Sequence, residues 1–506
     1  MLTWRWEFWL LVCFYGLFLL PQSSAGEEAP LRTARYRIDY ATYLGGTGDE
    51  QLREVIPYED GSVLVGGQTG SSDFPVTAGV VQPRYAGEPA GQGNPGIYGG
   101  DCLLARLSPD CKKILCATYF GGSRQERNVY GMALDRQGNV VITSSTRSPD
   151  LPTTPGAFQS RYCGGDSDWM VAKLSPDLTR VLWCTHVGGS AGESPRGGLA
   201  LDAEDYVYVV GTTGSADFPT TPGAFQRARK GQSDAALVKI KPDGSGLVLA
   251  TLLGGAGEDG IMGVSVDSSG RMYVAGHTTS SDFPVTPGAA QLVHAGASDC
   301  FLACLSPDAS RLLHATYLGG KGNEFAEHRL HLERDGSVLL TGVSSSPDFP
   351  RSVGALQKLL KGTSDGFLAK LTADGSQFAF STLLGGPGSE FYLMPTPDPE
   401  GNVFIAGQTG SPDFPVTADA LQGNYGGGAS DGVLAILSAD GKKLLYATFL
   451  GGSGDDLIRS LALSSDGAIY LVGNTTSKDF PVSPGAVQRD LAGMGDGFVV
   501  RLMPAR

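Results

Sequence analysis

The residues of this chain that could carry chemistry are seven carboxylates that recur at one offset, each eight residues after a repeated threonine. Hard oxygen ligands favour Ca²⁺, and clustered like charges focus a field that attracts a basic ligand. The sequence therefore predicts a ligand or cation ring, with Ca²⁺ as its only candidate cofactor. The alternative is that each carboxylate accepts N–H bonds from its own turn. The seven acids are Glu50, Glu126, Glu193, Asp259, Glu324, Glu390 and Asp456.

Three further motifs resemble catalytic or metal-binding patterns but lie in the wrong context. Ser364 and Ser430 each match G-x-S-x-G, yet a nucleophile elbow needs a strand before the serine and a helix after it. Here a glycine-rich loop leads into a strand pattern. Residues 255–260 match G-x-G-x-x-G but open no helix. His328 and His331 lie three apart in a predicted strand, so their side chains point to opposite faces. The sequence predicts no catalytic residue and no metal site besides the acid ring.

The acids belong to a repeat of about 66 residues that predicts the fold. The string TYLGG at residue 42 returns as TYFGG at 118, THVGG at 185, TLLGG at 251, TYLGG at 316, TLLGG at 382 and TFLGG at 448. Each unit holds four short runs of alternating apolar residues, separated by turns rich in Gly, Pro, Asp and Ser. A four-stranded unit repeated seven times is typical of an all-β, seven-bladed β-propeller with antiparallel blades.

The order of the strands within a blade also follows from the sequence. The run that contains Gly131, Gly198 or Gly263 has small residues, which suit the crowded strand nearest the axis. The chain begins with a lone outermost-type strand at residues 36–44 and ends with a lone third-type strand at residues 496–502. We expect these two strands to pair and close the ring. The acids then lie just before the innermost strands, around one axial opening. Pro57, Pro395 and Pro397 predict irregular innermost strands in blades 1 and 6.

The pattern DxFLAKLSPDG…LLYATYLGGxGxE…VDxxGxxYVAGxTxSxDFPVTPGAFQ resembles the bacterial seven-bladed β-propeller repeat family called SBBP. The resemblance runs from about Tyr36 to Leu502. It implies a propeller in an exported or cell-surface protein, and it supplies no catalytic residue. The chain departs from the pattern at Leu151, at His186 and in an insertion at residues 83–100.

Two smaller motifs predict packing roles. In the repeated DFP tripeptide, written DLP at residue 150, we expect Phe or Leu to fill the seam between blades and Asp to cap the following turn. The TPGA run at residues 154, 221 and 286 predicts a single helical turn, with Thr as its cap and Pro at its first position.

Composition and the N-terminus predict the protein class. The formal net charge of −14 argues against nucleic acid or anionic lipid as a partner. An apolar run at residues 8–20, followed by Ser23-Ser24-Ala25, predicts a signal peptide over 1–25, with an uncleaved anchor as the alternative. A linker at 26–35 and the propeller at 36–502 follow, and no other segment reaches transmembrane length. Seven cysteines lie beyond the predicted cleavage site, without a C-x-x-C pair.

These observations favour an exported, non-enzymatic binding or scaffolding protein, located in the periplasm, at the cell surface or outside the cell. Its expected partner is a protein or a glycan, contacted by the loops between the second and third strands, above all by the insertion at residues 83–100. The alternative is an exported enzyme that acts on a polysaccharide or small ligand in the axial funnel. Seven equivalent loops would favour the scaffold, whereas one divergent polar site would favour the enzyme.

Overall fold

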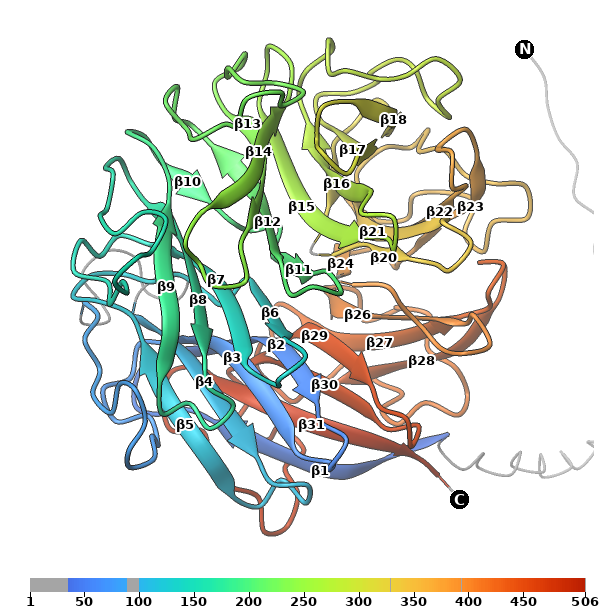
Figure 1. Ribbon diagram of the computed structural model, residues 1–506. Coiled ribbons are helices and arrows are strands. Elements are labelled where there is room, and N and C mark those ends of the chain that lie inside the picture. The colour runs from blue at the N-terminus through green and yellow to red at the C-terminus, as the bar shows by residue number, and fades with distance from the viewer. Residues whose placement is uncertain (1–34, 89–99, 328, 393, 506) are drawn as a thin grey trace, which may run out of the picture. The chain divides into compact units, whose positions relative to one another are not determined.

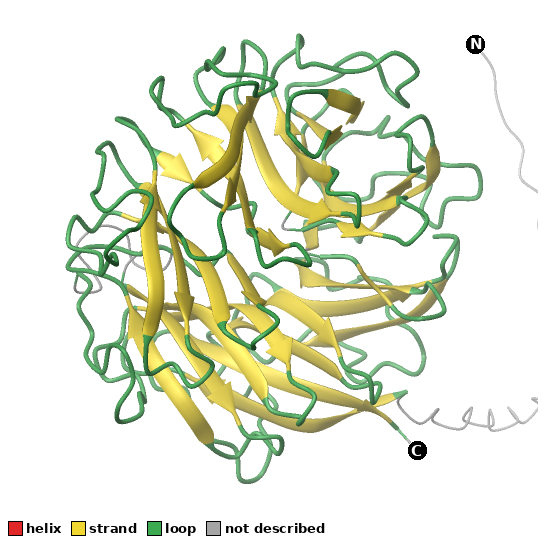
Figure 2. Ribbon diagram, viewed as in Figure 1, coloured by secondary structure: helices red, strands yellow, loops and turns green. Residues whose placement is uncertain are grey.

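The computed structural model describes residues 35–88, 100–327, 329–392 and 394–505 (Figure 1). These residues form seven antiparallel sheets in a ring, and every regular element among them is a strand (Figure 2). The predicted seven-bladed propeller is therefore confirmed. The predicted signal peptide, nearly all of the linker and residues 89–99 of the insertion lie outside the described residues. Within the described ranges, no helix is long and apolar enough to cross a membrane.

Each blade has four strands, here called A, B, C and D, which hydrogen bonds join in that order. Blade 1 consists of β2 (Glu50–Pro57), β3 (Val63–Thr69), β4 (Asp101–Leu107) and β5 (Ile114–Phe120). Blade 2 consists of β6 (Gly131–Leu134), β7 (Val140–Thr146), β8 (Asp168–Leu174) and β9 (Val181–Val187). Blade 3 consists of β10 (Glu193–Ser194) with β11 (Leu199–Leu201), β12 (Val207–Thr213), β13 (Asp234–Ile240) and β14 (Leu247–Leu253).

The remaining blades repeat this pattern. Blade 4 consists of β15 (Asp259–Val266), β16 (Met272–Thr278), β17 (Asp299–Leu305) and β18 (Leu312–Leu318). Blade 5 consists of β19 (Glu324–Ala326) with β20 (His331–Leu332), β21 (Val338–Ser344), β22 (Asp365–Leu371) and β23 (Phe378–Leu384). Blade 6 consists of β24 (Glu390–Tyr392) with β25 (Thr396–Pro397), β26 (Val403–Thr409), β27 (Asp431–Leu437) and β28 (Leu444–Leu450). Blade 7 consists of β29 (Asp456–Leu463), β30 (Ile469–Thr475), β31 (Asp496–Pro504) and β1 (Tyr36–Leu44).

The A strands lie innermost, as the small residues predicted. Neighbouring A strands contact one another, as β2 does with β29 and β6 does with β11 (Figure 1). A Cβ atom at Gly131 would lie 2.5 Å from the backbone nitrogen of Leu199 in the next blade. A Cβ at Gly263 would lie 2.8 Å from the backbone nitrogen of Leu330. Glycine is required at both positions because the converging strands leave no room for a side chain.

The irregular A strands differ in part from expectation. Pro57 ends β2 opposite Val63 without interrupting the strand, so the expected irregularity from a proline in blade 1 is wrong. In blade 6, Pro395 lies in the break between β24 and β25, as predicted. Blade 3 is also broken, at Pro195 between β10 and β11, and this break was not predicted. Proline cannot donate to a ladder and is therefore found where pairing stops.

Seven hydrophobic clusters fill the seams between neighbouring blades. The cluster between blades 7 and 1, for example, joins Tyr470 and Val499 to Leu52 and Leu103. Each seam contains one residue of the DFP motif, so the predicted role of this Phe or Leu is confirmed. These residues are Phe74, Leu151, Phe218, Phe283, Phe349, Phe414 and Phe480. The seven described cysteines are free thiols, and five of them are buried.

Two of the motif predictions are wrong in detail. The aspartate of DFP caps a different loop from the expected one: Asp73 Oδ1 accepts a bond from Thr47 N, at 2.9 Å, just after the LGG string. The TPGA run forms a β-turn instead of a helical turn. In blade 2, Ala157 N donates to Thr154 O at 3.1 Å, and Gly156 has φ of +83°. Pro followed by a left-handed Gly defines a type II turn, which the N-cap-like Thr-Pro pair concealed.

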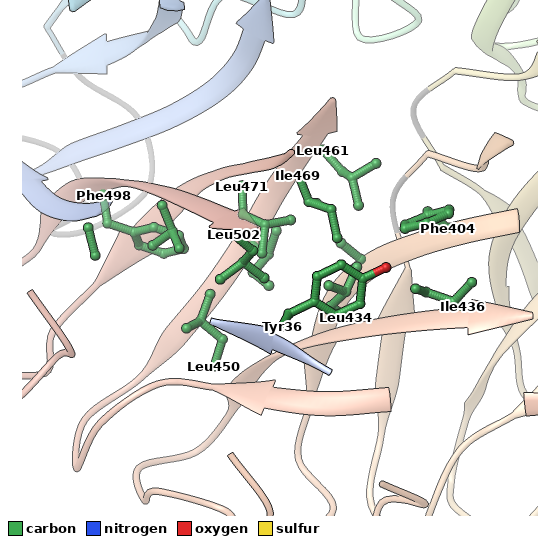
Figure 3. Close-up of a cluster of buried hydrophobic side chains, with 14 of the residues drawn as sticks. Tyr36, Phe404, Leu434, Ile436, Leu450, Leu461, Ile469, Leu471, Phe498 and Leu502 are labelled. Atoms are coloured by element: carbon green, nitrogen blue, oxygen red, sulfur yellow. The ribbon is translucent and has the colours of Figure 1, made fainter. Parts of the chain in front are cut away.

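The ring closes through the pairing of β1 with β31, as predicted. The register places Tyr40 opposite Arg501 and Tyr43 opposite Phe498. Tyr36 of β1 lies among Leu434 and Leu502 in the cluster that joins blades 6 and 7 (Figure 3). Its ring also meets Tyr446 edge-on at 4.9 Å. The N-terminal strand thus supplies both the D strand of blade 7 and part of a seam.

Deletion of residues 26–46 should abolish cooperative unfolding, because it removes β1 and exposes the edge of β31. The matched control is deletion of residues 26–34, which leaves β1 intact and should melt like the parent. Thermal unfolding followed by circular dichroism measures both variants. A longer deletion that melts with the parent's midpoint and cooperativity would show that β1 does not hold the ring closed.

Candidate functional site at the propeller axis

The seven predicted acids are buried within their own blades. Each is at most 1% exposed, and six of the seven begin an A strand, whereas Glu126 forms an isolated bridge to Thr146. Glu50 shows the common arrangement: it accepts a bond from Gly46 N at 2.9 Å and from Thr69 Oγ1 at 2.6 Å. The backbone nitrogen of the second glycine of LGG bonds the acid in every blade.

A second buried carboxyl group lies next to each acid, across the first glycine of LGG. A Cβ at Gly45 would lie 2.4 Å from Glu50 Oε2 and 2.8 Å from Asp496 Cγ. The backbone nitrogen of Gly45 instead donates to Gln488 Oε1 at 2.8 Å. The same pair of carboxyls surrounds this glycine at all seven junctions. The pairs are Glu50 with Asp496, Glu126 with Asp101, Glu193 with Asp168, Asp259 with Asp234, Glu324 with Asp299, Glu390 with Asp365, and Asp456 with Asp431.

This geometry corrects the predicted opening lined by carboxylates. The acids recur at one position, but each is enclosed by its own D–A and B–C loops and does not face an axial opening. The alternative, local bonds from the turn, accounts for the contacts that the acids make. Among the described residues, no three acidic, histidine or cysteine side chains group as metal ligands. Cation binding by the ring stays a prediction.

Burial raises the pKa of these carboxyl groups, because a charged carboxylate loses hydration inside the protein. The pKa of Glu50 rises to about 7 and that of Glu126 to about 8, despite the bonds that they accept. The pKa values of Asp101 and Asp168 each rise to about 7. In most pairs the neighbouring carboxyl adds to the rise through repulsion, as Asp101 does for Glu126.

The axis is where the blades differ. In the three continuous A strands, the register slips by one residue, at Arg53, Met262 and Arg459. Bulges turn a side chain out of the regular alternation and are common beside functional sites. In blades 3, 5 and 6 the A strand breaks near the same point, three residues after the acid. The residues at this position are Arg53, Val129, Arg196, Met262, Glu327, Leu393 and Arg459, of which Leu393 lies outside the described residues.

The backbone is also strained at this level. Arg329 has φ of +73° and Met394 has φ of +54°, both inside the breaks of A strands. Gly198 has φ of +75° in the corresponding break of blade 3. A residue other than glycine in this region costs of order 1–3 kcal/mol and persists where the surroundings enforce it. Such outliers cluster at functional sites, so the axis qualifies as a candidate.

Charged side chains from blades 1, 3 and 5 and a tyrosine from blade 2 lie at the axis. The Arg329 guanidinium of blade 5 bonds the carboxylate of Glu54 in blade 1. The Arg53 guanidinium lies over the ring of Tyr130, 5.2 Å from its centroid. Burial and then the charge of Arg196 lower the pKa of Arg53, while Glu54 and Glu327 oppose that change. Blades 1, 2, 3 and 5 therefore supply one cluster, here called the axial cluster: Arg53, Glu54, Tyr130, Arg196, Glu327 and Arg329.

Aromatic and amide side chains surround the axial cluster. Phe325, one residue after the acid of blade 5, is 39% exposed. Its ring meets that of His277 edge-on at 5.4 Å. Burial lowers the pKa of His277 to about 4, and Arg196 adds to this through repulsion, so the imidazole is neutral at pH 7. Asn128 Nδ2 donates to Gln51 Oε1 at 3.2 Å and joins blades 1 and 2.

The axial cluster was not predicted, because its residues are not common to all blades. A signal was present: three of the seven positions that follow the acids by three residues are arginines. The two G-x-S-x-G serines lie as expected, directly before β22 and β27, with loops in front of them.

The buried carboxyls predict a pH dependence of stability. Their folded pKa values exceed the unfolded ones, so their contribution is full below about pH 4 and is lost as pH rises through about 7. Asp308 is an exposed turn aspartate, and hydroxyl bonds from Ser306 and Ser310 help to lower its pKa to about 2. Aspartates of this kind affect the stability only at more acidic pH. We expect the melting temperature to fall by a few degrees or more between pH 5 and pH 8. Glu126→Gln should flatten this slope, whereas the exposed Glu204→Gln should not; equal slopes in all three proteins would refute the assignment.

The acid ring has a direct test with calcium. Because the carboxyl oxygens are enclosed and already accept bonds, we expect 5 mM Ca²⁺ to leave the melting temperature unchanged. A bound cation would raise the melting temperature, because binding stabilises the folded state by about 2.7 kcal/mol at a hundredfold excess over the dissociation constant. A rise that Glu324→Gln and Glu390→Gln together remove would restore the ring as a cation site.

No protein-family model and no curated protein sequence matches the chain. Among solved structures, BamB from Moraxella catarrhalis is 12% identical, with 92% of this chain and 100% of that chain covered and a TM-score of 0.37. The quinohemoprotein alcohol dehydrogenase from Comamonas testosteroni is 10% identical, with 94% and 77% covered and a TM-score of 0.43. A Dyadobacter fermentans protein of unknown function is 11% identical, with 93% and 100% covered and a TM-score of 0.39. Similarities this low carry no argument about function.

Proposed function

We propose that the chain is an exported, non-enzymatic β-propeller of the SBBP repeat family that acts as a binding or scaffolding module in the periplasm or at the cell surface. The family assignment rests on the LGG and DFP markers, and export rests on the apolar run at residues 8–20. The expected partner is a protein or a glycan.

One contrast supports a binding role. The seams and loops use the same bonds in every blade, whereas the axis differs from blade to blade. Thr69 and Thr409, for example, both donate to the acid of their own blade at 2.6 Å, whereas Arg53 of blade 1 corresponds to Met262 in blade 4. Shared packing keeps repeats alike, and a site that recognises a ligand is free to diverge.

The enzyme alternative is weaker at this axis. Glycoside hydrolysis needs two carboxyl groups that flank one bond. Of the two described axial glutamates, Glu54 is engaged by Arg329. This ion pair favours binding over hydrolysis.

Expression of the full chain in a bacterial host tests the proposal. We expect the protein in the periplasmic or envelope fraction, with a mature N-terminus at Gly26 by mass spectrometry. Leu17→Arg should keep it in the cytoplasm, because a charge interrupts the apolar run. The recovered protein should also leave a fluorophosphonate probe unreacted at Ser364 and Ser430. Cytoplasmic retention of the parent would refute export, and labelling of either serine would refute the non-enzymatic assignment.

A further inference from the structure

The loop between strands B and C of blade 5 carries two apolar side chains that point into solvent. Val353 is 97% exposed and Leu359 is 71% exposed. Val353 takes the place that proline or alanine has in the corresponding turns of the other six blades. Side chains this exposed add little packing to the free chain, so the fold itself does not account for them.

A cavity of about 480 Å³ lies on one side of this loop, between blades 4 and 5, with Val353 and Phe378 in its lining. Two departures from the repeat also line it. Ala290 of the blade 4 loop stands where the other blades have Val, Phe or Leu. Arg351 stands where blades 1, 4, 6 and 7 have a valine that packs against a seam cluster. A small and a polar side chain at positions that elsewhere carry apolar bulk leave the space open.

A second cavity, of about 370 Å³, lies on the other side of the loop, between blades 5 and 6. Both volumes fall within the range of ligand clefts, roughly 300–1,000 Å³. Val353 lines the first cavity and Leu359 lines the second, so the exposed residues and the cavities form one surface, here called the blade 5 surface. The apolar lining of the second cavity consists of Leu356, Leu359, Leu384, Pro415 and Leu444.

The charged residues among those that line the two cavities are cations, in a chain whose net charge is −14. Lys358 and Lys361 line the second cavity, and Arg351 lines the first. Lys361 Nζ donates to Gly385 O at 3.2 Å, and an ammonium group has three donors, so it retains donors for a ligand. Positive charge beside apolar cavities is complementary to acidic residues that flank apolar ones.

The arrangement fits an extended occupant better than a small one. A small molecule would fill one cavity and leave the exposed residue of the other uncovered, whereas a polypeptide segment can place an apolar side chain on each side of the loop. An anionic bilayer also combines acidic and apolar groups. Its broad surface, however, would be repelled by the net charge of −14, whereas a short segment contacts the blade 5 surface alone.

We propose that the blade 5 surface docks an acidic segment of a partner protein, with apolar side chains of the segment in the two cavities and its carboxylates at Lys358, Lys361 and Arg351. This inference rests on the proposed binding function and names the class of partner. Apolar burial supplies the affinity, and the cations select and orient an acidic segment.

Selection of a random peptide phage library on the immobilised mature chain tests the inference. We expect the enriched peptides to combine Asp and Glu with Leu, Phe or other large apolar residues. The most enriched peptide, labelled with a fluorophore, is then titrated with the parent and with each variant and followed by anisotropy. Its affinity for the parent should fall as the salt concentration rises, because salt screens the attraction between carboxylates and lysines.

Four variants locate the peptide on the molecule. Leu359→Ser should weaken peptide binding about tenfold or more, because the burial of one leucine is lost. Lys358→Glu should weaken it about threefold or more and reduce its salt dependence, because a carboxylate replaces a positive charge. Met494→Ser and Arg489→Glu are the matched controls in the B–C loop of blade 7 and should bind like the parent. Met494 is 70% exposed, and Arg489 follows the repeated glutamine as Lys358 does.

All four side chains are exposed, so unchanged melting temperatures should confirm that the variants fold. Enriched peptides without acidic residues, or binding that Leu359→Ser and Lys358→Glu leave unchanged, would refute the docking site. Binding to phosphatidylglycerol vesicles that Lys358→Glu removes would assign the surface to a membrane. A dimer in analytical ultracentrifugation that Leu359→Ser dissociates would assign it to a second copy of the chain. Either of these two results would also overturn the inference.

The outcomes that overturn the proposed function are different. A chain that is exported and unlabelled by the fluorophosphonate probe, yet selects no acidic peptide, would refute this inference alone. Retention in the cytoplasm or labelling of Ser364 would refute the proposed function, whatever the peptide selection shows.

Discussion

At each junction between blades, two buried carboxyl groups lie on either side of one glycine, and each accepts hydrogen bonds from backbone nitrogens of the adjoining loops. The glycine nitrogen binds a glutamine of the B–C loop, and the next nitrogen binds the acid at the start of the A strand. Two loops from different parts of the repeat are thereby fixed to each other at one point. The space left for the glycine is less than a methyl group, so the LGG string follows from the carboxyl pair. Burial of these carboxyl groups disfavours their charged form, and the pKa of Glu126 is raised for this reason.

The repeated hydrogen bonds make the blades alike at the rim, whereas the blades differ at the axis. At the rim it makes the blades equivalent, and each seam accepts one DFP side chain in the same place. At the axis the A strands bulge or break. The residues released there, such as Arg53 and Arg196, contribute to no ladder and are free to differ. The repeat therefore specifies the blades and their seams, whereas the side chains at the axis differ from blade to blade.

The sequence was sufficient for the parts of the structure that repetition specifies. The seven blades, the innermost position of Gly131 and the closure by residues 36–44 all followed from markers that recur. The sequence was insufficient where one short residue pattern is compatible with two local structures. Thr154-Pro155 fits both a helix N-cap and a type II turn, and only the φ of Gly156 separates them. A fixed offset locates Glu50 along the chain but does not say whether its carboxylate points into a loop or towards the axis. The axial cluster does not follow from the repeat, since its residues are not common to all blades.

Closure by β1 has a consequence for the order in which the protein folds. Tyr43 and Phe498 pair across almost the whole length of the described chain, so their contact has a very high sequence separation. Loop closure of this length is slow, and it cannot begin before the last C strand is available. Until then, β1 is an apolar strand with two unpaired edges, held by no sheet. Because the chain is synthesised from its N-terminus, β1 must avoid pairing with other molecules while the six complete blades that follow it in the sequence form.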